Sequence, residues 1–345
     1  MAKRDIIVIG ASAGGYEALK ILVSGLPADL PASVFVVWHM SPEIRESVLP
    51  YALQKAGNLP AKQAVDGEEI KPGQIYVAPP DFHLLLESDR VRVTKGPKEN
   101  RFRPAVDPLF RSAAYNFGSR VVGIVLSGAL DDGTAGLWTI KYRGGTVIVQ
   151  DPLDAEFPSM PKSAMREVKV DYCLPVSEIA GILTGLTAEQ AEEALDIDMK
   201  EDAKIKTEIG IAAEDYAFER GVMNLGELSP FTCPECHGVL LKLKDGKIVR
   251  FRCHTGHAFS TDSLLTSVTE SVEDSMWNAI RVMEESVMLL NHIGNHLTEN
   301  EQNDLAELYF TKAREAENRV NIMRQAVFNH EHLNAEKLRR QTVVS

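Results

Sequence analysis

The chain has 345 residues, of which 44% are hydrophobic and 25% charged, ordinary values for a globular protein of two or three domains. Its formal net charge of −12 argues against general binding to nucleic acid or to anionic membranes, since both require a basic face. No apolar stretch reaches the roughly 20 residues that span a bilayer, and the apolar run after Lys3 and Arg4 is too short for a signal peptide, so we expect a cytoplasmic protein.

Residues 1–186 alternate short apolar runs with segments long enough for helices. Five runs rich in Val and Ile are expected to be buried strands, at residues 5–9, 33–38, 74–78, 121–126 and 146–150. Helices such as 16–24 and 108–116 would connect them. This alternation predicts an α/β domain with a doubly wound, mostly parallel sheet covered by helices on both faces. Residues 83–87 and 91–94 are expected to form a small hairpin set into that sheet.

The next two parts of the chain differ in composition from the first. Residues 187–228 are predicted to be an acidic connector, because twelve acidic and only four basic residues lie between 189 and 227. Residues 229–261 are predicted to be a compact, zinc-ribbon-like unit. Its two strand-like runs flank Asp245-Gly246, a dipeptide that is typical of hairpin turns.

Residues 262–335 are predicted to form a helical hairpin, because apolar residues recur there at three- and four-residue spacing. Asp262 or Ser263 would cap its first helix. The apolar faces either pack on each other or supply a surface for a partner or for a homodimer.

The first predicted strand ends in a turn of small residues that is followed by a helix. In a dinucleotide loop we would expect G-x-G-x-x-G spacing and an acidic residue at the end of the second strand. The spacing at residues 10–15 is instead G-x-x-x-G-G, and the second strand ends in His39, so nucleotide binding is disfavoured. The other interpretation makes Ser12 an exposed nucleophile whose neighbouring amides and helix dipole stabilise an oxyanion.

Three predicted strand ends bring complementary side chains to one rim of the sheet. Ser12 follows the first strand, His39 follows the second, and Asp131 and Asp132 follow residues 121–126. A serine hydroxyl needs a base to become nucleophilic, and the base needs an orienting acid. Each residue alone is usually structural: a turn serine, a core histidine, a turn aspartate. Their joint placement favours a Ser–His–Asp hydrolase site made of Ser12, His39 and Asp132.

These segments are similar to those of the CheB-type protein-glutamate methylesterases. The similar segments, in chain order, are IGASAGG at residues 9–15, VVWHM at 36–40, APPDFH at 78–83, RPAVD at 103–107, LSGALDDG at 126–133, QD at 150–151 and MP at 160–161. The resemblance covers residues 5 to about 185 and is carried by segments in the same order.

The resemblance implies hydrolysis of methyl esters on glutamate side chains of chemoreceptor-type proteins, with release of methanol, and in some members deamidation of glutamine. Ser12 would attack the ester, His39 would relay the proton and Asp132 would orient His39. The amide of Ala129 is a candidate oxyanion donor, and no cofactor is expected for catalysis. Two departures from the family are expected: no receiver domain of the kind found in the best-known members before the first strand, and no side-chain donor at residue 13, where Ala13 stands in place of the Thr of many members.

Alternatives remain open at this stage. The chain could hydrolyse a different ester by the same chemistry, or it could be a catalytically silent scaffold that binds through its C-terminal half. The expected partner is a methylated chemoreceptor or a similar protein, with no nucleic acid and no membrane insertion.

A second candidate site lies in the zinc-ribbon-like unit. Two cysteines in C-x₂-C spacing precede a third cysteine and a histidine, a set that fits a structural, tetrahedral zinc ion. The four predicted ligands are Cys233, Cys236, Cys253 and His257. His237 and His254 are rival fourth ligands, and the alternative is a reduced, metal-free knuckle. Cys173 is expected to be a buried core thiol.

Overall fold

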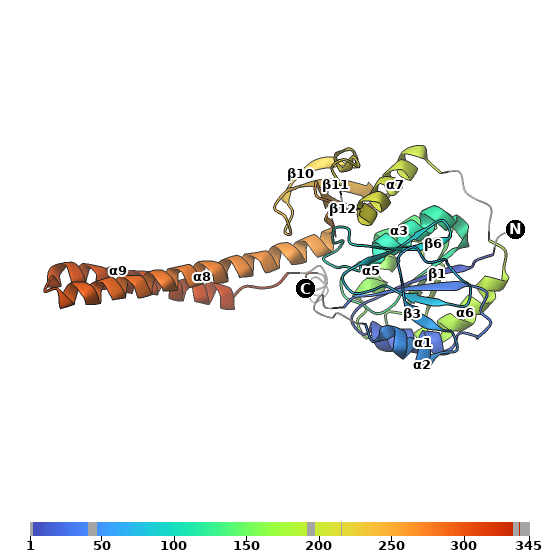
Figure 1. Cartoon of the computed structure of the whole chain (residues 1–345), viewed down its shortest axis with the longest axis horizontal. Coiled ribbons are helices and arrows are strands. Elements are labelled where there is room, and N and C mark those ends of the chain that lie inside the picture. Colours follow the sequence, from blue (N-terminus) through green and yellow to red (C-terminus); the bar gives the residue numbers. More distant parts are fainter. Residues whose placement is uncertain (1–2, 41–46, 192–196, 215, 334–337, 339–345) are drawn as a thin grey trace. The chain divides into compact units, whose positions relative to one another are not determined.

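The computed structural model describes the chain in five segments, residues 3–40, 47–191, 197–214, 216–333 and 338. The chain divides into two compact units, residues 1–264 and 265–345. The first unit holds a large and a small sheet, and the second holds most of a helical hairpin (Figure 1). Among the described residues, no helix combines the length and the apolar character that crossing a bilayer requires.

The main sheet has seven strands in the order β3-β4-β2-β1-β7-β8-β9, and each adjacent pair is parallel. The strand bounds are Ile6–Ala11 (β1), Ser33–Trp38 (β2), Ala61–Gln63 (β3), Ile75–Val77 (β4), Val121–Val125 (β7), Thr146–Gln150 (β8) and Tyr172–Leu174 (β9). The five strands predicted from apolar runs occupy the five central positions, and the short strands β3 and β9 form the edges. The predicted doubly wound α/β domain is therefore confirmed.

Helices cover both faces of the main sheet (Figure 1). One face carries Gly15–Ser24 (α1), Leu49–Ala56 (α2) and Val176–Ala188 (α6), and the other carries Val106–Phe117 (α3), Thr134–Tyr142 (α4) and Ser159–Glu167 (α5). Side chains of β1 alternate between the two cores, with Ile7 and Ile9 in one and Ile6 and Val8 in the other. The chain winds outward in opposite directions on the two sides of β1, which is where open α/β sheets carry their sites.

The predicted hairpin forms, as His83–Glu87 (β5) and Arg90–Thr94 (β6), but its predicted place in the main sheet is wrong. The two strands make a separate two-stranded sheet that packs against α3. Leu84 and Leu86 are buried in the core on that side, and the Leu86 amide donates to Ser112 Oγ in α3 at 3.0 Å. The hairpin is therefore held by a helix instead of by a neighbouring strand of the main sheet.

Part of the predicted acidic connector is a packed helix, Met199–Glu214 (α7). Ile205, Glu208 and Ile211 of this helix are buried, and the Ala212 carbonyl accepts a hydrogen bond from Thr94 at 2.7 Å. The composition indicates a solvated connector with some helix. The helix is present, but one of its faces is buried, which the acidic count does not reveal. Residues 192–196 and 215 of the connector lie outside the described residues.

A four-stranded antiparallel sheet follows, which we call the small sheet (Figure 1). Its strands are Glu227–Thr232 (β10), Val239–Asp245 (β11), Ile248–Cys253 (β12) and Ala258–Ser260 (β13). The predicted hairpin between β11 and β12 turns at Gly246, whose φ of 57° suits glycine. The predicted caps of the next helix are wrong: the helix begins at Thr261, and Ser260 Oγ accepts the amide of Ser263 at 2.9 Å.

The predicted helical hairpin is present as Thr261–Glu299 (α8) and Asn303–Phe328 (α9). Ile280 and Val320 are buried between the two helices, with Met276 and Met323 packed beside them. Other apolar residues of the predicted faces are exposed, namely Val268, Val272, Leu305 and Leu308. The apolar faces thus pack on each other only in part.

Candidate active site

The ends of β1, β2 and β7 lie side by side, and this places the three predicted residues at one edge of the sheet. Ala11 of β1 pairs with Trp38 of β2, and the amide of His39 donates to the Ala11 carbonyl at 3.1 Å. On the other side of β1, the amide of Leu126 donates to the Gly10 carbonyl at 2.9 Å. Ser12, His39 and the turn after β7 therefore leave the sheet together.

Ser12, His39 and Asp132 form a chain of hydrogen-bonding distances. Ser12 Oγ lies 3.2 Å from His39 Nδ1, and His39 Nε2 lies 2.8 Å from Asp132 Oδ2. With the imidazole proton on Nε2 donating to Asp132, Nδ1 is free to accept the proton of the serine hydroxyl. The exposed fraction is 9% at Ser12, 8% at His39 and 2% at Asp132, so all three residues are largely buried, and Ser12 is less exposed than the sequence analysis expects.

Asp132 is held by four donors besides His39. The amide of Val106 donates to Oδ2 at 2.7 Å, and Oδ1 accepts from Asn100 Nδ2 at 2.8 Å, from the Gly133 amide at 2.9 Å and from the Asp107 amide at 3.3 Å. Burial alone would raise the pKa of Asp132, but the hydrogen bond and charge of His39, together with the Val106 and Asn100 donors, lower it. The carboxylate is thus kept ionised and in one orientation.

The backbone around Ser12 is fixed as well. Its amide donates to the Ser127 carbonyl at 3.0 Å, and its carbonyl accepts from the Gly15 amide and from Trp38 Nε1, each at 2.9 Å. The Ser12 amide is therefore not available to an oxyanion. Among the described residues, no backbone acceptor takes the amide of Ala129, the donor suggested by the sequence.

Two contacts of this site are absent from the sequence-based prediction. The ring of Phe102 stacks on His39 with centroids 3.9 Å apart, and it limits rotation of the imidazole. Asn100 bonds Asp132. Both residues lie in an irregular segment without periodic pattern, so no sequence signal pointed to them.

Asp131 and Asp132, the two acidic residues in the turn after β7, face different parts of the structure. Asp132 faces His39, whereas Asp131 accepts a hydrogen bond from Ser260 Oγ in the small sheet at 2.6 Å. Burial and the nearby charge of Asp262 raise the pKa of Asp131 to about 7. Of the two, only Asp132 is placed to orient the histidine.

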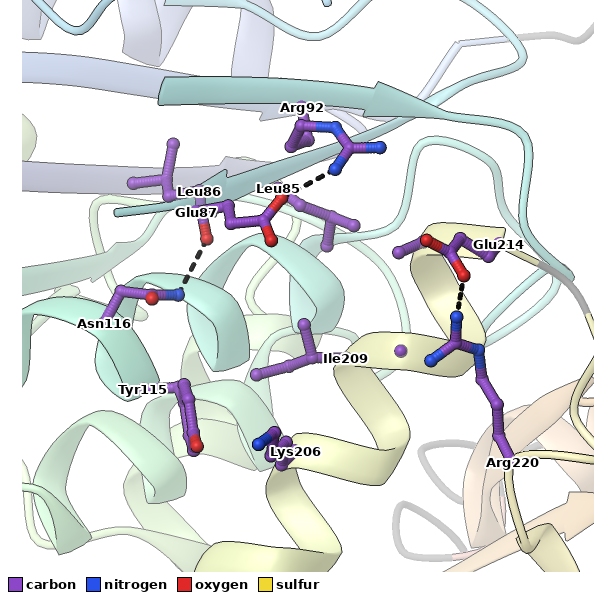
Figure 2. A pocket seen from close by; sticks show the side chains of 12 residues that line it. Leu85, Leu86, Glu87, Arg92, Tyr115, Asn116, Lys206, Ile209, Glu214 and Arg220 are labelled. Atoms are coloured by element: carbon purple, nitrogen blue, oxygen red, sulfur yellow. Dashed lines mark hydrogen bonds and ion pairs between the residues drawn. The ribbon is translucent and has the colours of Figure 1, made fainter. Parts of the chain in front are cut away.

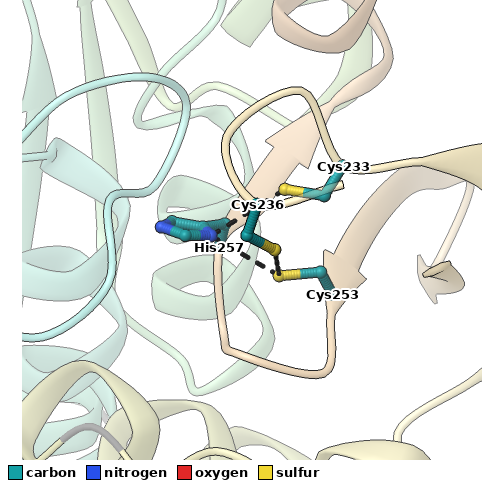
Figure 3. Close-up of side chains that lie close together, drawn as sticks. All are labelled: Cys233, Cys236, Cys253 and His257. Carbon is teal, nitrogen blue, oxygen red and sulfur yellow. Dashed lines mark hydrogen bonds between the residues drawn. The ribbon is translucent and has the colours of Figure 1, made fainter. Parts of the chain in front are cut away.

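The four cysteine and histidine residues predicted as metal ligands lie together at one end of the small sheet (Figure 3). Their ligand atoms all lie within 4.8 Å of one another, and no other group of three or more such residues occurs in the part of the chain that is described. Cys236 Sγ lies 3.6 Å from Cys253 Sγ, and His257 Nδ1 lies 3.8 Å from Cys233 Sγ and 3.6 Å from Cys253 Sγ. The rivals His237 and His254 are not in this group.

These spacings suit a tetrahedral metal ion. Zn–S bonds of about 2.3 Å in a tetrahedron place two sulfurs about 3.8 Å apart, close to the separations seen here. The group could therefore hold one metal ion with all four positions filled. Cys173, in contrast, is exposed in edge strand β9, so its predicted burial in the core is wrong.

A pocket of about 220 Å³ lies away from these residues, between the β5–β6 hairpin, α3 and α7 (Figure 2). Its lining includes Arg92, paired with Glu87, and Arg220, paired with Glu214. None of the predicted site residues lines it, and its arginines are already neutralised. The group formed by Ser12, His39 and Asp132 therefore lies outside this pocket.

Comparison with known proteins points the same way as the geometry. Residues 7–183 match a protein family described as CheB methylesterase. A protein of Leptospira interrogans is 38% identical over 190 residues, which is 55% of this chain and 98% of that protein. The protein-glutamate methylesterase/protein-glutamine glutaminase of Thermotoga maritima is 41% identical over 178 residues, 50% of this chain and 52% of that protein.

A solved structure also matches. The crystal structure of the Thermotoga maritima CheB methylesterase catalytic domain is 39% identical with a TM-score of 0.51, and the match covers 54% of this chain and all of that one. The chain spans about half the length of the full T. maritima relative, while the small sheet and the helical hairpin lie beyond the residues that match the family.

Proposed function

This chain belongs to the CheB methylesterase family, and from that premise we propose that it removes methyl esters from glutamate side chains of chemoreceptor-type proteins, with Ser12 as its nucleophile. The observation that carries the proposal is the chain of contacts from Ser12 through His39 to Asp132 at three adjacent strand ends. A nucleophile, a base within reach of it and an acid behind the base are the parts that acyl transfer requires.

The first half of the reaction forms an acyl-enzyme. Ser12 Oγ attacks the carbonyl carbon of the ester while His39 Nδ1 takes the hydroxyl proton. The tetrahedral intermediate then expels methanol, whose oxygen receives that proton from His39. Asp132, ionised and fixed by its donors, stabilises the imidazolium between these two steps.

The second half regenerates the serine. A water molecule gives a proton to His39 Nδ1 and attacks the acyl carbon, and the collapse of the second intermediate returns the proton to Ser12 Oγ. The product is a glutamate carboxylate. With a glutamine side chain the same steps release ammonia in place of methanol, and the names of the relatives cover both reactions.

Two features of this chain support a backbone oxyanion site. Residue 13 is alanine, which has no side-chain donor, and the Ser12 amide is engaged with Ser127. The Ala129 amide directly follows Gly128, which packs against Ser12, and it is the donor that we assign to the developing oxyanion.

We also propose that Cys233, Cys236, Cys253 and His257 bind a structural zinc ion. A filled tetrahedral shell leaves no position for substrate, so the ion would stabilise the small sheet and take no part in ester hydrolysis. Metal thiolates need reduced cysteines, which fits the predicted cytoplasmic location. The predicted homodimer through the C-terminal helices stays a prediction, and sedimentation equilibrium of the full chain tests it.

The hydrolase chemistry can be tested without knowledge of the receptor. A fluorophosphonate that reacts with activated serines should label the wild-type chain, and peptide mapping should locate the label at Ser12. Ser12→Ala should abolish labelling. No labelling of the wild type would favour a catalytically silent scaffold, and labelling together with failure on methylated glutamate would favour another ester as the substrate.

A further inference from the structure

The small sheet is joined to the part of the chain that holds the main sheet, residues 1–186, which we call the catalytic domain, and the junction lies next to the proposed triad. The amide of Ala258 in β13 donates to the Lys98 carbonyl at 3.2 Å, and the amide of Asn100 donates to the Ala258 carbonyl at 2.8 Å. Asn100 is buried at this junction. Its backbone is therefore set by the small sheet, although its side chain points to Asp132.

The side-chain amide of Asn100 uses all of its hydrogen-bonding capacity. Nδ2 lies 2.8 Å from Asp132 Oδ1 and 2.9 Å from Asp107 Oδ2. Oδ1 accepts the backbone amide of Ser260 at 2.8 Å and lies 3.2 Å from the hydroxyl of Ser263. An asparagine amide has two donors and two acceptor sites, and each has a partner here.

These partners define one orientation of the amide. The opposite orientation would set the Asn100 oxygen against two carboxylates and the NH₂ group against the N–H of Ser260. Both contacts would be repulsive in this buried site, where an unsatisfied polar group is costly. The acids of the catalytic domain and the donors of the small sheet together select the observed orientation.

Asn100 matters to Asp132 because, apart from His39, it is the one side-chain donor to that carboxylate among the described residues. Asp107 lies beside it, and burial and the charge of Asp132 raise the pKa of Asp107 well above its usual range. One amide group thus bridges two neighbouring carboxyl groups and holds Oδ1 of Asp132 while Oδ2 faces His39.

We propose that Asn100 is a positioning residue for Asp132, and that the Ser260 amide and the Ser263 hydroxyl of the C-terminal part keep its side chain in the working orientation. The small sheet is then more than an appended module, since the triad carboxylate is held correctly only when that sheet is docked. This inference rests on the proposed hydrolase function.

The test measures the rate at which a fluorophosphonate labels Ser12 in full-length variants. Ser12→Ala is the negative control, in which no labelling is expected. Asn100→Ala should slow labelling by about ten- to a hundredfold, the range expected when a carboxylate loses one hydrogen bond. Ser263→Ala should slow it by a smaller factor. Ser275→Ala, an exposed serine on the same helix, should label at the wild-type rate.

Asn100→Asp separates positioning from folding, because it keeps the size of the side chain. The introduced carboxyl faces Asp107 and Asp132, so its own pKa will be raised and it can donate to Asp132 only when protonated. Its labelling rate relative to wild type should therefore rise as the pH falls from about 8 to about 6. The rate is expressed per folded chain, so a residue that only supports the fold would give a ratio independent of pH.

The outcomes are distinct. Absence of wild-type labelling would overturn the proposed function and this inference with it. The inference alone would be overturned if the wild type labels normally and both Asn100→Ala and Asn100→Asp label at the wild-type rate at every pH. If Asn100→Ala fails to fold, the test rests on the pH dependence of Asn100→Asp labelling and on the labelling rate of Ser263→Ala. Labelling of both variants at the wild-type rate would contradict the inference.

Discussion

Arg252 in the small sheet donates to Glu99 of the catalytic domain at 2.7 Å, and both side chains are buried. Glu99 also accepts from Arg111 of α3, while Arg252 also reaches Glu208 of α7. Burial alone would raise the pKa of Glu99, but the charges of Arg111 and Arg252 lower it to about 2. This ionic cluster therefore ties the small sheet and α7 to the catalytic domain, one residue before Asn100.

Replacement of Glu99 should loosen this junction. Glu99→Gln leaves two buried guanidinium groups with less negative charge, so we expect a loss of roughly 3 kcal/mol in the free energy of unfolding by urea. The control is Glu87→Gln, which removes an exposed ion pair with Arg92 and should cost less than about 1 kcal/mol. Equal losses for the two variants would contradict the role of the cluster.

The raised pKa of Asp131 predicts a pH dependence of stability. Its pKa is about 7 in the folded chain against an ordinary value of 3.8, so the folded state holds a proton that the unfolded state releases. Stability should therefore decrease as the pH rises from about 4 to about 7. Asp131→Asn should flatten this part of the profile and be more stable than wild type at alkaline pH, as thermal unfolding at several pH values will show. A variant with the wild-type profile would refute this assignment.

Gly128 allows close packing against Ser12, the proposed nucleophile. A Cβ atom at this position would lie 2.0 Å from Met160 Sδ and 2.9 Å from Ser12 Cβ. Gly128→Ala should displace Ser12 and lower the labelling rate by about a hundredfold, the effect of a misplacement near 1 Å. Gly181→Ala in α6, where the added atom meets nothing within 4 Å, should leave the rate unchanged.

Metal removal should unfold the small sheet. Elemental analysis should find about one zinc per chain, and EDTA or Cys233→Ser should remove it and lower the melting temperature of this part. Because the small sheet holds Asn100, the same treatment should slow labelling of Ser12. Cys173→Ser, an exposed cysteine outside the group, is the control and should retain the metal. Equal zinc content in the two cysteine variants would contradict the metal site.

The sequence was sufficient to predict that Ser12, His39 and Asp132 lie together. Ser12, His39 and Asp132 each follow an apolar run that reads as a buried parallel strand, and parallel strands end at a common edge. The grouping of Cys233, Cys236, Cys253 and His257 was also predictable from the sequence, because their spacing and the turn at Gly246 are local features. In both cases the sequence signal for each residue lies within a few positions of that residue.

The remaining features depend on contacts between distant segments. Asn100 has no periodic neighbours, and its role arises only because residues 258–263 pack beside residues 98–100. Two short strand-like segments joined by a brief turn identified the 83–94 hairpin, but these local features do not say that α3 would be its support. Cys173 lies among apolar residues, and its exposure follows from the position of β9 at the sheet edge, which the sequence does not reveal.

The most direct measurement is methanol release from a methylated chemoreceptor fragment by three chains: wild type, Ser12→Ala and Ser24→Ala, the last an exposed serine at the end of α1. Our account predicts release by the wild type and by Ser24→Ala, and none by Ser12→Ala. Methanol release by Ser12→Ala at the wild-type rate would contradict it.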